Sequence, residues 1–594
     1  MATEISVSEI RAAFGKQKPI FARAAMFSVV IGLLMLAPSI YMLEVYDRVV
    51  NSRSVTTLVM LTLLLVLLYA VLEVLEWARQ CVLRQAAEGF DLTLGGRVHE
   101  AAFRAGVLGA RNLGLGGLRD FATVRDFISS PVMTGIMDIP MALLLVVVIF
   151  LIDPVLGWFG LASAVIQGAI TFFNKQSAGS PLAKANTLSF QAQNFVEASL
   201  RNGEVVRAMG MAEGLRQRWL KLQKELLSQQ AQASDRAGVF SALSKYVQLV
   251  SSSLMLGLGA WLLLNGSFTG SAGLILMASI LSGRALAPLV QVIISWRSVV
   301  IAREALARLE ELLTKVPAFE PGLPLPAPQG RLTVEHVTAR APGMAAASKP
   351  VLRNVAFDLP PGKMLAVVGP SASGKSSLAH LLVGAWPCLA GTVRLDGADV
   401  YAWNKLELGP HIGFLPQDVA LFEGTVAQNI ARFGQVDLNR IKRAAKITGV
   451  HGLIQALPQG YNTRIGDEGT VLSGGMRQRI GLARAIYGSP RLVVLDEPNA
   501  NLDEKGDAAL IHSLQVLRSA GATVVVVTHR KNLLAMADLM LLMMDGEVKA
   551  FGAPNDVLAA LQAPAAARGG AGRLPRAPVT PIGSRSAVKP AAVA

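Results

Sequence analysis

A chain of 594 residues has room for several domains of ordinary size. Its residues are 52% hydrophobic and only 16% charged, whereas soluble proteins usually carry about 25% charged residues. The net charge of +15 comes without an aromatic and basic recognition strip, so we expect contact with a lipid bilayer and no nucleic-acid partner. Two cysteines, Cys81 and Cys388, are too few and too far apart for a disulfide framework or a cysteine metal site.

The chain begins with a short polar lead-in, residues 1–20. Two apolar stretches follow, Phe21–Leu43 and Val55 to about Leu75, and each has the roughly 20 residues that cross a bilayer. The polar segment Glu44–Ser54 separates them. The first stretch is too long for a cleaved secretory signal and has no small-residue cleavage site. The sequence therefore predicts a membrane hairpin that keeps its first helix.

The same pattern occurs twice more. Met137–Ile152 and Val155–Phe173 are apolar and meet at a tight turn, Asp153-Pro154. Tyr246 to Leu264 and Gly270 to Val292 form the last apolar pair. Three hairpins of this kind predict six membrane spans.

Long polar connections, from Glu76 to about Ser130 and from Asn174 to about Lys245, join the hairpins. Their charges fall at helical spacing, so we expect residues 21–316 to form an all-α domain whose membrane helices extend well into the cytosol. A separate soluble helical domain is the alternative, but short outer turns paired with long inner loops argue against it. Lys and Arg collect in the lead-in and the long connections, so the positive-inside rule predicts that both chain ends are cytoplasmic.

One charged residue, Arg284, lies within the last apolar span. Ionisable residues inside membrane spans usually face a cavity or a partner, so this arginine is a candidate for lining a substrate path. A position in the cytoplasmic extension of the helix explains it equally well. Both interpretations stay open at this stage.

A proline-rich linker, residues 317–330, marks a domain boundary. Strands and helices alternate in residues 331–561, as in an α/β domain with a parallel sheet. Residues 562–594 are a basic tail of Ala, Pro, Gly and Arg with little to bury, so we expect it to be disordered. Its arginines either touch lipid headgroups or are simply solvated.

A phosphate-binding loop is predicted after the apolar run Met364–Val368, because the next residues contain two glycines separated by four residues and followed by Lys and Ser. Glycines let backbone N–H groups point at phosphate oxygens, and the start of the following helix adds positive charge. We expect Lys375 to reach the outer phosphates and Ser376 to ligate Mg²⁺. The residues predicted to bind the nucleotide here are Gly369, Pro370, Ser371, Ala372, Ser373, Gly374, Lys375, Ser376 and Ser377.

Two further apolar strands also end in reactive residues. Leu492–Asp496 is followed by Glu497, and Thr523–Thr528 is followed by His529. Ligands of open parallel sheets bind beyond the carboxyl ends of the strands, so these residues are expected to converge on one nucleotide. We expect Asp496 to hold Mg²⁺, Glu497 to orient and deprotonate the attacking water, and His529 to hydrogen-bond the terminal phosphate.

The segment Leu472–Arg479 opens a helix with Ser-Gly-Gly, a second phosphate-binding nest. It resembles the signature of ABC transporters, while Gly369–Ser376 and Leu492–Glu497 resemble their two Walker motifs. Thr528-His529 is similar to the histidine switch. Gln417, in the stretch Leu-Pro-Gln-Asp, is similar to the glutamine loop, and Asn501-Leu502-Asp503 is similar to the aspartate loop.

The resemblance implies ATP and Mg²⁺ as cofactors and a six-helix transmembrane exporter domain fused to a P-loop ABC nucleotide-binding domain. It also implies a homodimer, because each ATP then lies between the phosphate loop of one copy and the signature of the other. Thr463–Gly469 resembles the loop that exporters place ahead of the signature. The implied catalytic residues are Glu497, His529, Gln417 and Asp503; the implied metal contacts are Ser376, Gln417 and Asp496; the implied signature contacts are Ser473, Gly474 and Gly475.

A narrower resemblance covers nearly the whole chain. Tyr41–Val49, Asn202–Met211 and His411–Val419 are similar to stretches of type I secretion permease/ATPases of the protease and lipase exporter group. That group implies ATP-driven export of unfolded proteins with uncleaved C-terminal signals across the bacterial inner membrane, with a periplasmic adaptor and an outer-membrane channel. Barely twenty residues precede the first span, so we expect no peptidase domain. An exporter of lipid, peptide or drug, and a non-transporting scaffold switched by ATP, remain alternatives.

The sequence departs from the family pattern in two places. Met476 stands where the signature usually has Gln, so a hydrogen bond across the interface is expected to be missing. The stretch Arg340-Ala341-Pro342-Gly343 lacks the aromatic that commonly stacks on adenine. Base stacking contributes about 1–3 kcal/mol in nucleic-acid complexes, so we expect ATP binding with modest base selectivity.

Overall fold

A computed structural model describes residues 2–319, 322–344, 347–466 and 472–562 of the chain. The protein divides into two compact units. The first comprises Met1–Gly106 and Arg111–Ala318, and the second comprises Val107–Ala110 and Phe319–Ala594. The basic tail predicted for residues 562–594 lies, apart from Gln562, outside the described residues.

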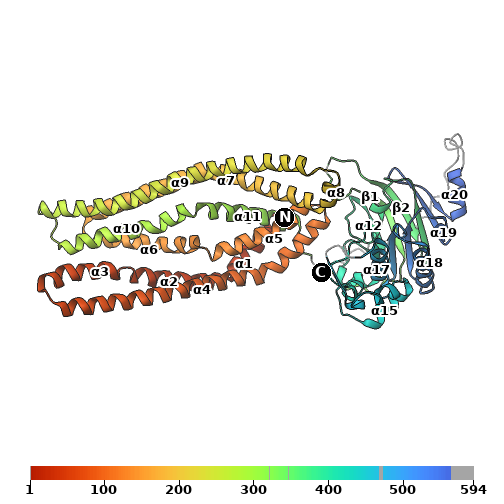
Figure 1. The fold of residues 1–594 in the computed structure, drawn as a ribbon, viewed down its shortest axis with the longest axis horizontal. Coiled ribbons are helices and arrows are strands. Elements are labelled where there is room, and N and C mark those ends of the chain that lie inside the picture. The colour runs from red at the N-terminus through yellow and green to blue at the C-terminus, as the bar shows by residue number, and fades with distance from the viewer. Residues whose placement is uncertain (1, 320–321, 345–346, 467–471, 563–594) are drawn as a thin grey trace, which may run out of the picture. The chain divides into compact units, whose positions relative to one another are not determined.

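The first unit is helical throughout its regular structure, and its longest helices run alongside one another (Figure 1). Helix α9 packs along α7 and α10, and α10 also packs on α6. The helices are α1 (Ala2–Lys16), α2 (Lys18–Leu34), α3 (Ala37–Glu44), the π-helix η1 (Val45–Val50), α4 (Val55–Val107), α5 (Arg111–Ile128), α6 (Pro131–Ile152), α7 (Pro154–Arg201), α8 (Gly203–Ala208), α9 (Ala212–Leu264), α10 (Ala272–Ile294) and α11 (Trp296–Lys315).

Within the described residues, six helical segments are long and apolar enough to cross a membrane. They are Lys18–Val50, Val55–Val107, Leu113–Ile152, Pro154–Ser177, Ala212–Leu264 and Ala272–Ile294. The two 53-residue helices α4 and α9 would each be about 80 Å long at 1.5 Å per residue, far more than the roughly 30 Å hydrocarbon core. Helices of this length exceed what a bilayer crossing requires, and the cytosolic extension of the membrane helices stays a prediction.

Two segments near the N-terminus are more regular than the sequence suggested. The polar lead-in forms helix α1, whose Ile10 and Ala13 are buried in a cluster with Phe90 of α4. The polar segment between the first two spans continues the helix as η1, in which Arg48 pairs with Glu44 at 2.9 Å one turn away. A polar segment between two membrane spans can therefore be helical and is not necessarily a loop.

The tight turn between α6 and α7 lies where the sequence placed it. The Asp153 carboxylate accepts hydrogen bonds from the N–H groups of Val155 and Leu156, at 2.8 and 3.2 Å, and Pro154 starts the next helix. An aspartate cap followed by proline satisfies the free N–H groups of a helix start. One residue therefore both ends α6 and begins α7.

A buried ion cluster joins three helices of this unit. Arg79 of α4 is 2% exposed, and its Nη2 donates to both Glu76 carboxylate oxygens at 2.8 and 2.7 Å. Its Nη1 donates to Asp138 of α6 at 2.6 Å and to Ser28 of α2 at 2.9 Å. The half-buried Arg284 of α10, by contrast, has no hydrogen bond or ion pair with any residue that the structure describes.

The second unit has an α/β fold. Its strands are β1 (Leu332–Ala339), β2 (Leu352–Leu359), β3 (Met364–Val368), β4 (Ala390–Leu395), β5 (Ala398–Asp399), β6 (Ile412–Leu415), β7 (Gly424–Thr425), β8 (Arg464–Ile465), β9 (Leu492–Asp496), β10 (Thr523–Val527), β11 (Leu539–Met544) and β12 (Glu547–Gly552). Its helices are α12 (Lys375–Leu382), α13 (Lys405–Leu408), η2 (Gly409–His411), α14 (Val426–Ile430), α15 (Leu438–Ile447), α16 (His451–Gln455), η3 (Gly460–Asn462), α17 (Gly474–Ile486), α18 (Glu504–Ser519), α19 (Lys531–Leu534) and α20 (Pro554–Gln562).

The central sheet has the strand order β12-β11-β3-β10-β9-β6, and the pairs from β11 to β6 are parallel. Its middle strands are buried on both faces, since Val524 and Val526 of β10 enter one hydrophobic cluster and Val525 and Val527 enter the other. Burial on both faces explains why these strands are continuous apolar runs. Because β3, β10 and β9 are neighbours, their carboxyl ends lie at the same edge.

A second sheet in this unit is antiparallel, which the sequence reading of one parallel sheet did not include. Its strand order is β2-β1-β4-β5. Strands β1 and β2 mix buried and exposed positions instead of burying every residue. That mixture is typical of an antiparallel sheet with one face toward the core. The central sheet also carries one antiparallel edge strand, β12.

Candidate functional site: a nucleotide site at the strand ends

The predicted phosphate loop connects β3 to α12 and depends on two glycines. Gly369 has φ +155°, and a Cβ on it would lie 2.2 Å from the Met543 carbonyl oxygen. Gly374 has φ +95° and caps the N-terminus of α12, so a side chain there would be strained. Lys375 Nζ donates to the carbonyl oxygens of Gly369 and Pro370, at 2.9 and 2.7 Å. The loop thus holds its lysine over its own backbone, beside the start of a helix.

The remaining residues of the loop differ in exposure and backbone geometry. Pro370, Ser371 and Ala372 are exposed, and Ala372 has a left-handed φ of +63°. Ser373 is buried, and its hydroxyl has no hydrogen-bond partner among the described residues. Ser376 and Ser377 lie in the first turn of α12 and are partly buried. A buried free hydroxyl at a helix start suits an anionic ligand.

Asp496 ends β9 as a buried carboxylate, 2% exposed. Its side chain is hydrogen-bonded to Ser376, but its Oδ1 has no partner among the described residues. Burial raises the pKa of this carboxyl above its usual range, and the hydrogen bond from Ser376 offsets part of the rise. The structure therefore brings together two of the three predicted metal contacts, Ser376 and Asp496.

These oxygens fit a magnesium ion. Mg²⁺ prefers hard oxygen ligands and is usually held by one or two protein groups together with phosphates of the substrate. The Ser376 hydroxyl and the free Oδ1 of Asp496 provide that donor set. No group of three or more His, Cys, Asp or Glu that could hold a metal by itself occurs in the part of the chain that the structure describes.

Glu497 follows Asp496 in a left-handed backbone conformation, with φ +45°. Its N–H donates to the Val527 carbonyl of β10 at 3.0 Å, which fixes the turn. Gln417, just after β6, donates from Nε2 to the Glu497 Oε2 at 3.5 Å. Strained backbone of this kind is concentrated at functional sites, where surrounding structure holds it. Two residues predicted from separate motifs thus meet at the edge of the sheet.

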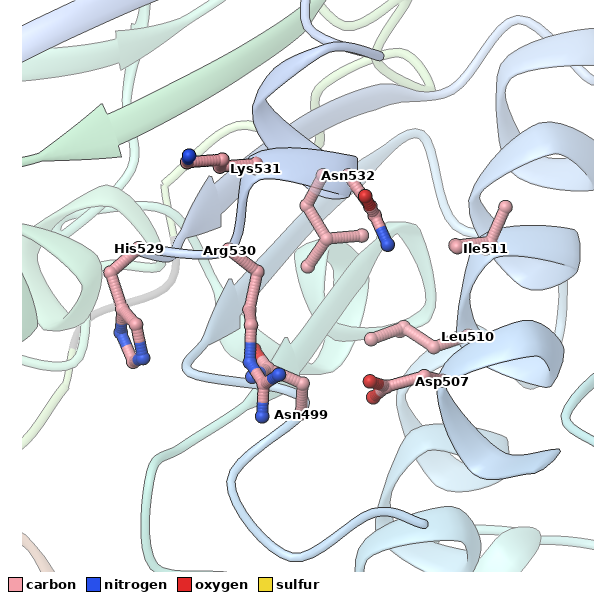
Figure 2. A pocket seen from close by; sticks show the side chains of 9 residues that line it. Asn499, Asp507, Leu510, Ile511, His529, Arg530, Lys531 and Asn532 are labelled. Carbon is pink, nitrogen blue, oxygen red and sulfur yellow. The ribbon is translucent and has the colours of Figure 1, made fainter. Parts of the chain in front are cut away.

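His529 lies exposed after β10, where the Thr528 N–H donates to the Val367 carbonyl oxygen of β3 at 3.3 Å. A cavity of 320 Å³ adjoins it (Figure 2). The cavity is lined by Asn499, Asp507, Leu510, Ile511, His529, Arg530, Lys531, Asn532 and Leu533. The sequence analysis did not single out Asn499, Asp507 or Arg530. The available signal was the basic residue that directly follows His529.

The predicted signature segment begins α17. Ser473 caps the helix, and its Oγ accepts from the Met476 N–H at 3.4 Å. A Cβ on Gly475 would lie 2.9 Å from the Asn501 carbonyl oxygen, so the aspartate loop approaches closely. Met476 packs against a hydrophobic cluster of this unit. In the described structure of one chain, Ser473, Gly474 and Gly475 make no hydrogen bond to the phosphate loop.

Asp503 caps α18 and pairs with the signature helix. Its carboxylate accepts from the Gly506 N–H at 2.8 Å and from the Arg479 guanidinium. The hydrogen bond from Gly506 and the charge of Arg479 lower the pKa of Asp503. Buried Gln478 makes a second link, which sequence reasoning missed, by donating to the Pro498 carbonyl oxygen at 3.1 Å. The residue after Glu497 is therefore tied directly to α17.

Two further expectations are placed by the structure only in part. In the loop ahead of the signature, β8 (Arg464–Ile465) pairs with β7, but residues 467–471 lie outside the described residues. The stretch from Arg340 to Gly343 follows β1, and the Arg340 Nε donates to the Ser348 carbonyl oxygen at 3.1 Å.

Comparison with known proteins agrees with this arrangement. Residues 352–500 match the ABC transporter family, and residues 21–284 match the ABC transporter transmembrane region. A bacterial Atm1-family ABC exporter with ATP bound has the same fold, with a TM-score of 0.78 and 21% identity over 91% of this chain and 96% of that chain. The expected fold, a helical membrane domain joined to an α/β nucleotide-binding domain, is confirmed.

Curated relatives narrow the family further. The type I secretion system ATP-binding protein PrsD of Rhizobium meliloti (strain 1021) is 43% identical over 533 residues, which is 89% of this chain and 91% of that protein. The leukotoxin translocation ATP-binding protein LktB of Bibersteinia trehalosi is 27% identical, over 91% of this chain and 77% of that protein. The chain therefore belongs to the ABC transporter family, as a nucleotide-binding ATPase of the type I secretion group with a multi-pass membrane domain.

Proposed function

We propose that the chain is the ATP-driven inner-membrane exporter of a type I secretion system. The observation that carries the proposal is the 43% identity to PrsD along nearly the whole chain, which covers membrane helices and nucleotide site together. Its cargo is unfolded protein with an uncleaved C-terminal signal, passed on through a periplasmic adaptor and an outer-membrane channel. The name of LktB, a leukotoxin translocation protein, supports a protein cargo over a lipid or a drug.

The chemistry follows from the residues at the strand ends. Backbone N–H groups between Gly369 and Ser377 bind the phosphates of ATP, and Lys375 moves from its own carbonyls to the outer phosphates. Ser376, Asp496 and Gln417 would hold Mg²⁺. When bound, Mg²⁺ neutralises charge that develops on the phosphate oxygens.

Glu497 orients the attacking water and accepts its proton. Its backbone turn and its contact with Gln417 hold the carboxylate at the end of β9, next to Asp496. His529 contacts the terminal phosphate from the neighbouring strand β10. Positioning and charge compensation of this kind provide most of the catalysis in phosphoryl transfer. Asp503 contributes by tying the aspartate loop to the signature helix through Arg479.

A homodimer completes the site. Ser473, Gly474 and Gly475 have no hydrogen bond to the phosphate loop of their own described chain, yet they begin a helix whose N-terminus favours anions. The signature of one copy therefore covers the ATP held by the other. Lys and Arg in the lead-in and the long helical connections support a cytoplasmic location of both chain ends. Binding of two ATP closes the dimer, and hydrolysis resets it.

The first test replaces Glu497 with Gln in the full-length protein. The variant keeps the shape of the side chain but removes the base, so it is expected to bind Mg–ATP, accumulate as a closed dimer and lose hydrolysis and secretion. Glu504→Gln is the matched control, because Glu504 is an exposed carboxylate in the first turn of α18. Dimer formation is measured by light scattering and hydrolysis by phosphate release. Continued turnover by the Glu497→Gln variant contradicts the proposal.

The cargo requires a separate experiment. Proteins in the culture medium are compared between cells that contain and cells that lack the gene. Loss of specific proteins from the medium supports protein export. An unchanged set of secreted proteins together with lipid-stimulated ATPase activity indicates a lipid or drug exporter. Absence of directional transport in vesicles, with ATP turnover intact, indicates an ATP-switched scaffold.

A further inference from the structure

The cavity beside His529 contains polar groups that have no partners. Asn499 is 4% exposed, and its Oδ1 and the Oδ1 of Asp507 are buried oxygens without a hydrogen bond to any described residue. The side chain of Arg530, next to His529, is exposed and makes no hydrogen bond or ion pair within the described chain. Figure 2 shows Asn499, Asp507 and Arg530 pointing into the same space.

The two kinds of group are chemically complementary. A carboxylate and an amide oxygen accept hydrogen bonds, whereas a guanidinium has five N–H donors in a planar fork and accepts none. A buried acceptor without a donor is unfavourable, and arginine with a carboxylate forms one of the stronger hydrogen-bonded pairs in proteins. One guanidinium can therefore satisfy the Oδ1 atoms of both Asn499 and Asp507.

The position of these residues connects two parts of the nucleotide site. Asn499 follows Glu497 in the chain, and Asp507 lies in the first turn of α18, where its N–H donates to the Asp503 carbonyl oxygen at 2.8 Å. Arg530 is bonded directly to His529 and precedes α19. Pairing of Arg530 with Asp507 and Asn499 would hold the loop that contains His529 against the segment that follows Glu497, the predicted base.

We propose that Arg530 closes onto Asp507 and Asn499 when nucleotide is bound, and thereby holds His529 in position for hydrolysis. Arg530 and Asp507 are positioning residues: they act through His529 and do not touch the nucleotide. The inference rests on the proposed role of His529 at the terminal phosphate. The exposed side chain of Arg530 lines the same cavity as Asp507 and Asn499, while the backbone of its loop is held by the Arg530 N–H donating to the Thr528 Oγ1 at 3.1 Å.

The test uses the full-length protein in lipid nanodiscs and measures kcat and KM for Mg–ATP. Arg530→Ala and Asp507→Asn are each expected to lower kcat about 10-fold, the low end of the loss seen when an outer-shell partner is removed from a metal site, with KM nearly unchanged. Because both act through one contact, the double variant should be no slower than either single variant. Arg530→Lys, which keeps the charge but loses the fork, should recover only part of kcat.

The matched control is Lys531→Ala. Lys531 is exposed, basic and adjacent to Arg530, and Figure 2 shows it pointing away from Asp507 and Asn499. The inference is overturned if this control loses as much kcat as Arg530→Ala, if the effects of Arg530→Ala and Asp507→Asn multiply, or if KM changes and kcat does not. Should Asp507→Asn not fold, Arg530→Ala and Arg530→Lys decide the question, since Arg530 is exposed and unpaired within the described chain.

Failure of this inference is distinguishable from failure of the proposed function. Turnover by Glu497→Gln contradicts the proposed hydrolysis itself, whatever the Arg530 variants do. An inactive Glu497→Gln variant combined with full kcat in Arg530→Ala overturns only the pairing. Binding of Mg–ATP by the Glu497→Gln protein is expected to be the same with and without Arg530→Ala, and a weakened affinity places Arg530 on the nucleotide instead.

Discussion

Each of the two units contains a charged side chain that is buried to the same extent. Only the side chain in the helical unit is paired with groups of opposite charge. Arg79 of the helical unit and Asp496 of the α/β unit are both 2% exposed. Arg79 meets two carboxylates and a hydroxyl from three helices. Asp496 has one hydroxyl, from Ser376, and an Oδ1 without a hydrogen-bond partner among the described residues.

The difference separates a structural charge from a ligand-binding one. A buried charge is costly unless it is paired. A buried charge that is incompletely paired is therefore kept for a reason other than stability. The charge of Arg79 is balanced by carboxylates from α4 and α6, although its Nε has no hydrogen-bond partner among the described residues, and its contacts link α2, α4 and α6. Asp496 lies at a strand end, and burial raises the pKa of its carboxyl. Shifts of this kind are frequent at functional sites, so we expect a ligand to complete the pairing of Asp496.

The largest effect, a loss of stability, is expected when the paired charge of Arg79 is removed. Arg79→Met leaves Glu76 and Asp138 without their counter-charge, and breaking a buried pair typically costs about 3–5 kcal/mol. Since proteins are stable by only about 5–15 kcal/mol, the variant is expected to melt far below the wild type or to accumulate poorly. Thermal unfolding in detergent measures the loss. The control is Arg84→Met, at an exposed arginine of the same helix, and an equal loss there would remove the distinction.

The unpaired charge should behave in the opposite way. Asp496→Asn removes the proposed metal contact. Loss of an outer-shell partner at a metal site costs up to about 100-fold in activity, and loss of a metal ligand should cost no less, so Mg²⁺-dependent ATP hydrolysis is expected to fall at least about 100-fold. Its unfolding temperature without nucleotide should stay the same or rise, because burial disfavours the ionised carboxylate that the amide replaces. Phosphate release and thermal unfolding measure the two results. A large drop in unfolding temperature would instead make Asp496 a structural residue.

The pH dependence of stability sharpens the same point. Because burial raises the pKa of Asp496 in the folded state, its contribution to stability is greatest below its unfolded pKa and is lost as the pH rises through the raised value. Without nucleotide, wild type should therefore lose stability relative to Asp496→Asn over that rise. In the wild type, Mg–ATP should remove this pH-dependent loss of stability by pairing the carboxylate. Melting temperatures across pH, with and without Mg–ATP, measure it, and a loss that persists in the wild type with ligand contradicts the assignment.

The smallest effect concerns the base of the nucleotide. The stretch Arg340 to Gly343 has no aromatic side chain, so ATP and GTP are expected to be hydrolysed with kcat/KM values within about 10-fold of each other, given that stacking contributes about 1–3 kcal/mol. Arg340→Tyr should increase the preference for ATP. Competition between the two nucleotides measures the preference. Strong selection of ATP by the wild type shows that another group reads the base.

Local patterns were sufficient for much of the molecule. Apolar runs of about twenty residues predicted the membrane helices, and the turn at Asp153 lies where the sequence placed it. The three apolar strands ending before the phosphate loop, Glu497 and His529 are adjacent in the sheet. These features depend on hydrophobic spacing and on residues close together in the chain, which a sequence displays directly.

Contacts between distant segments were decided only by the tertiary structure. Arg79 and Asp138 are 59 residues apart, and Gln417 and Glu497 are 80 apart, so no local pattern pairs them. The antiparallel sheet, the burial of Ile10 and Ala13 of α1, and the cavity of Asn499, Asp507 and Arg530 likewise arise from packing. The sequence by itself determined that a nucleotide loop is joined to membrane helices, because both signals are short-range. Which buried charges are paired and which remain open to a ligand was decided by how the elements pack, because side-chain pairing depends on distances in space.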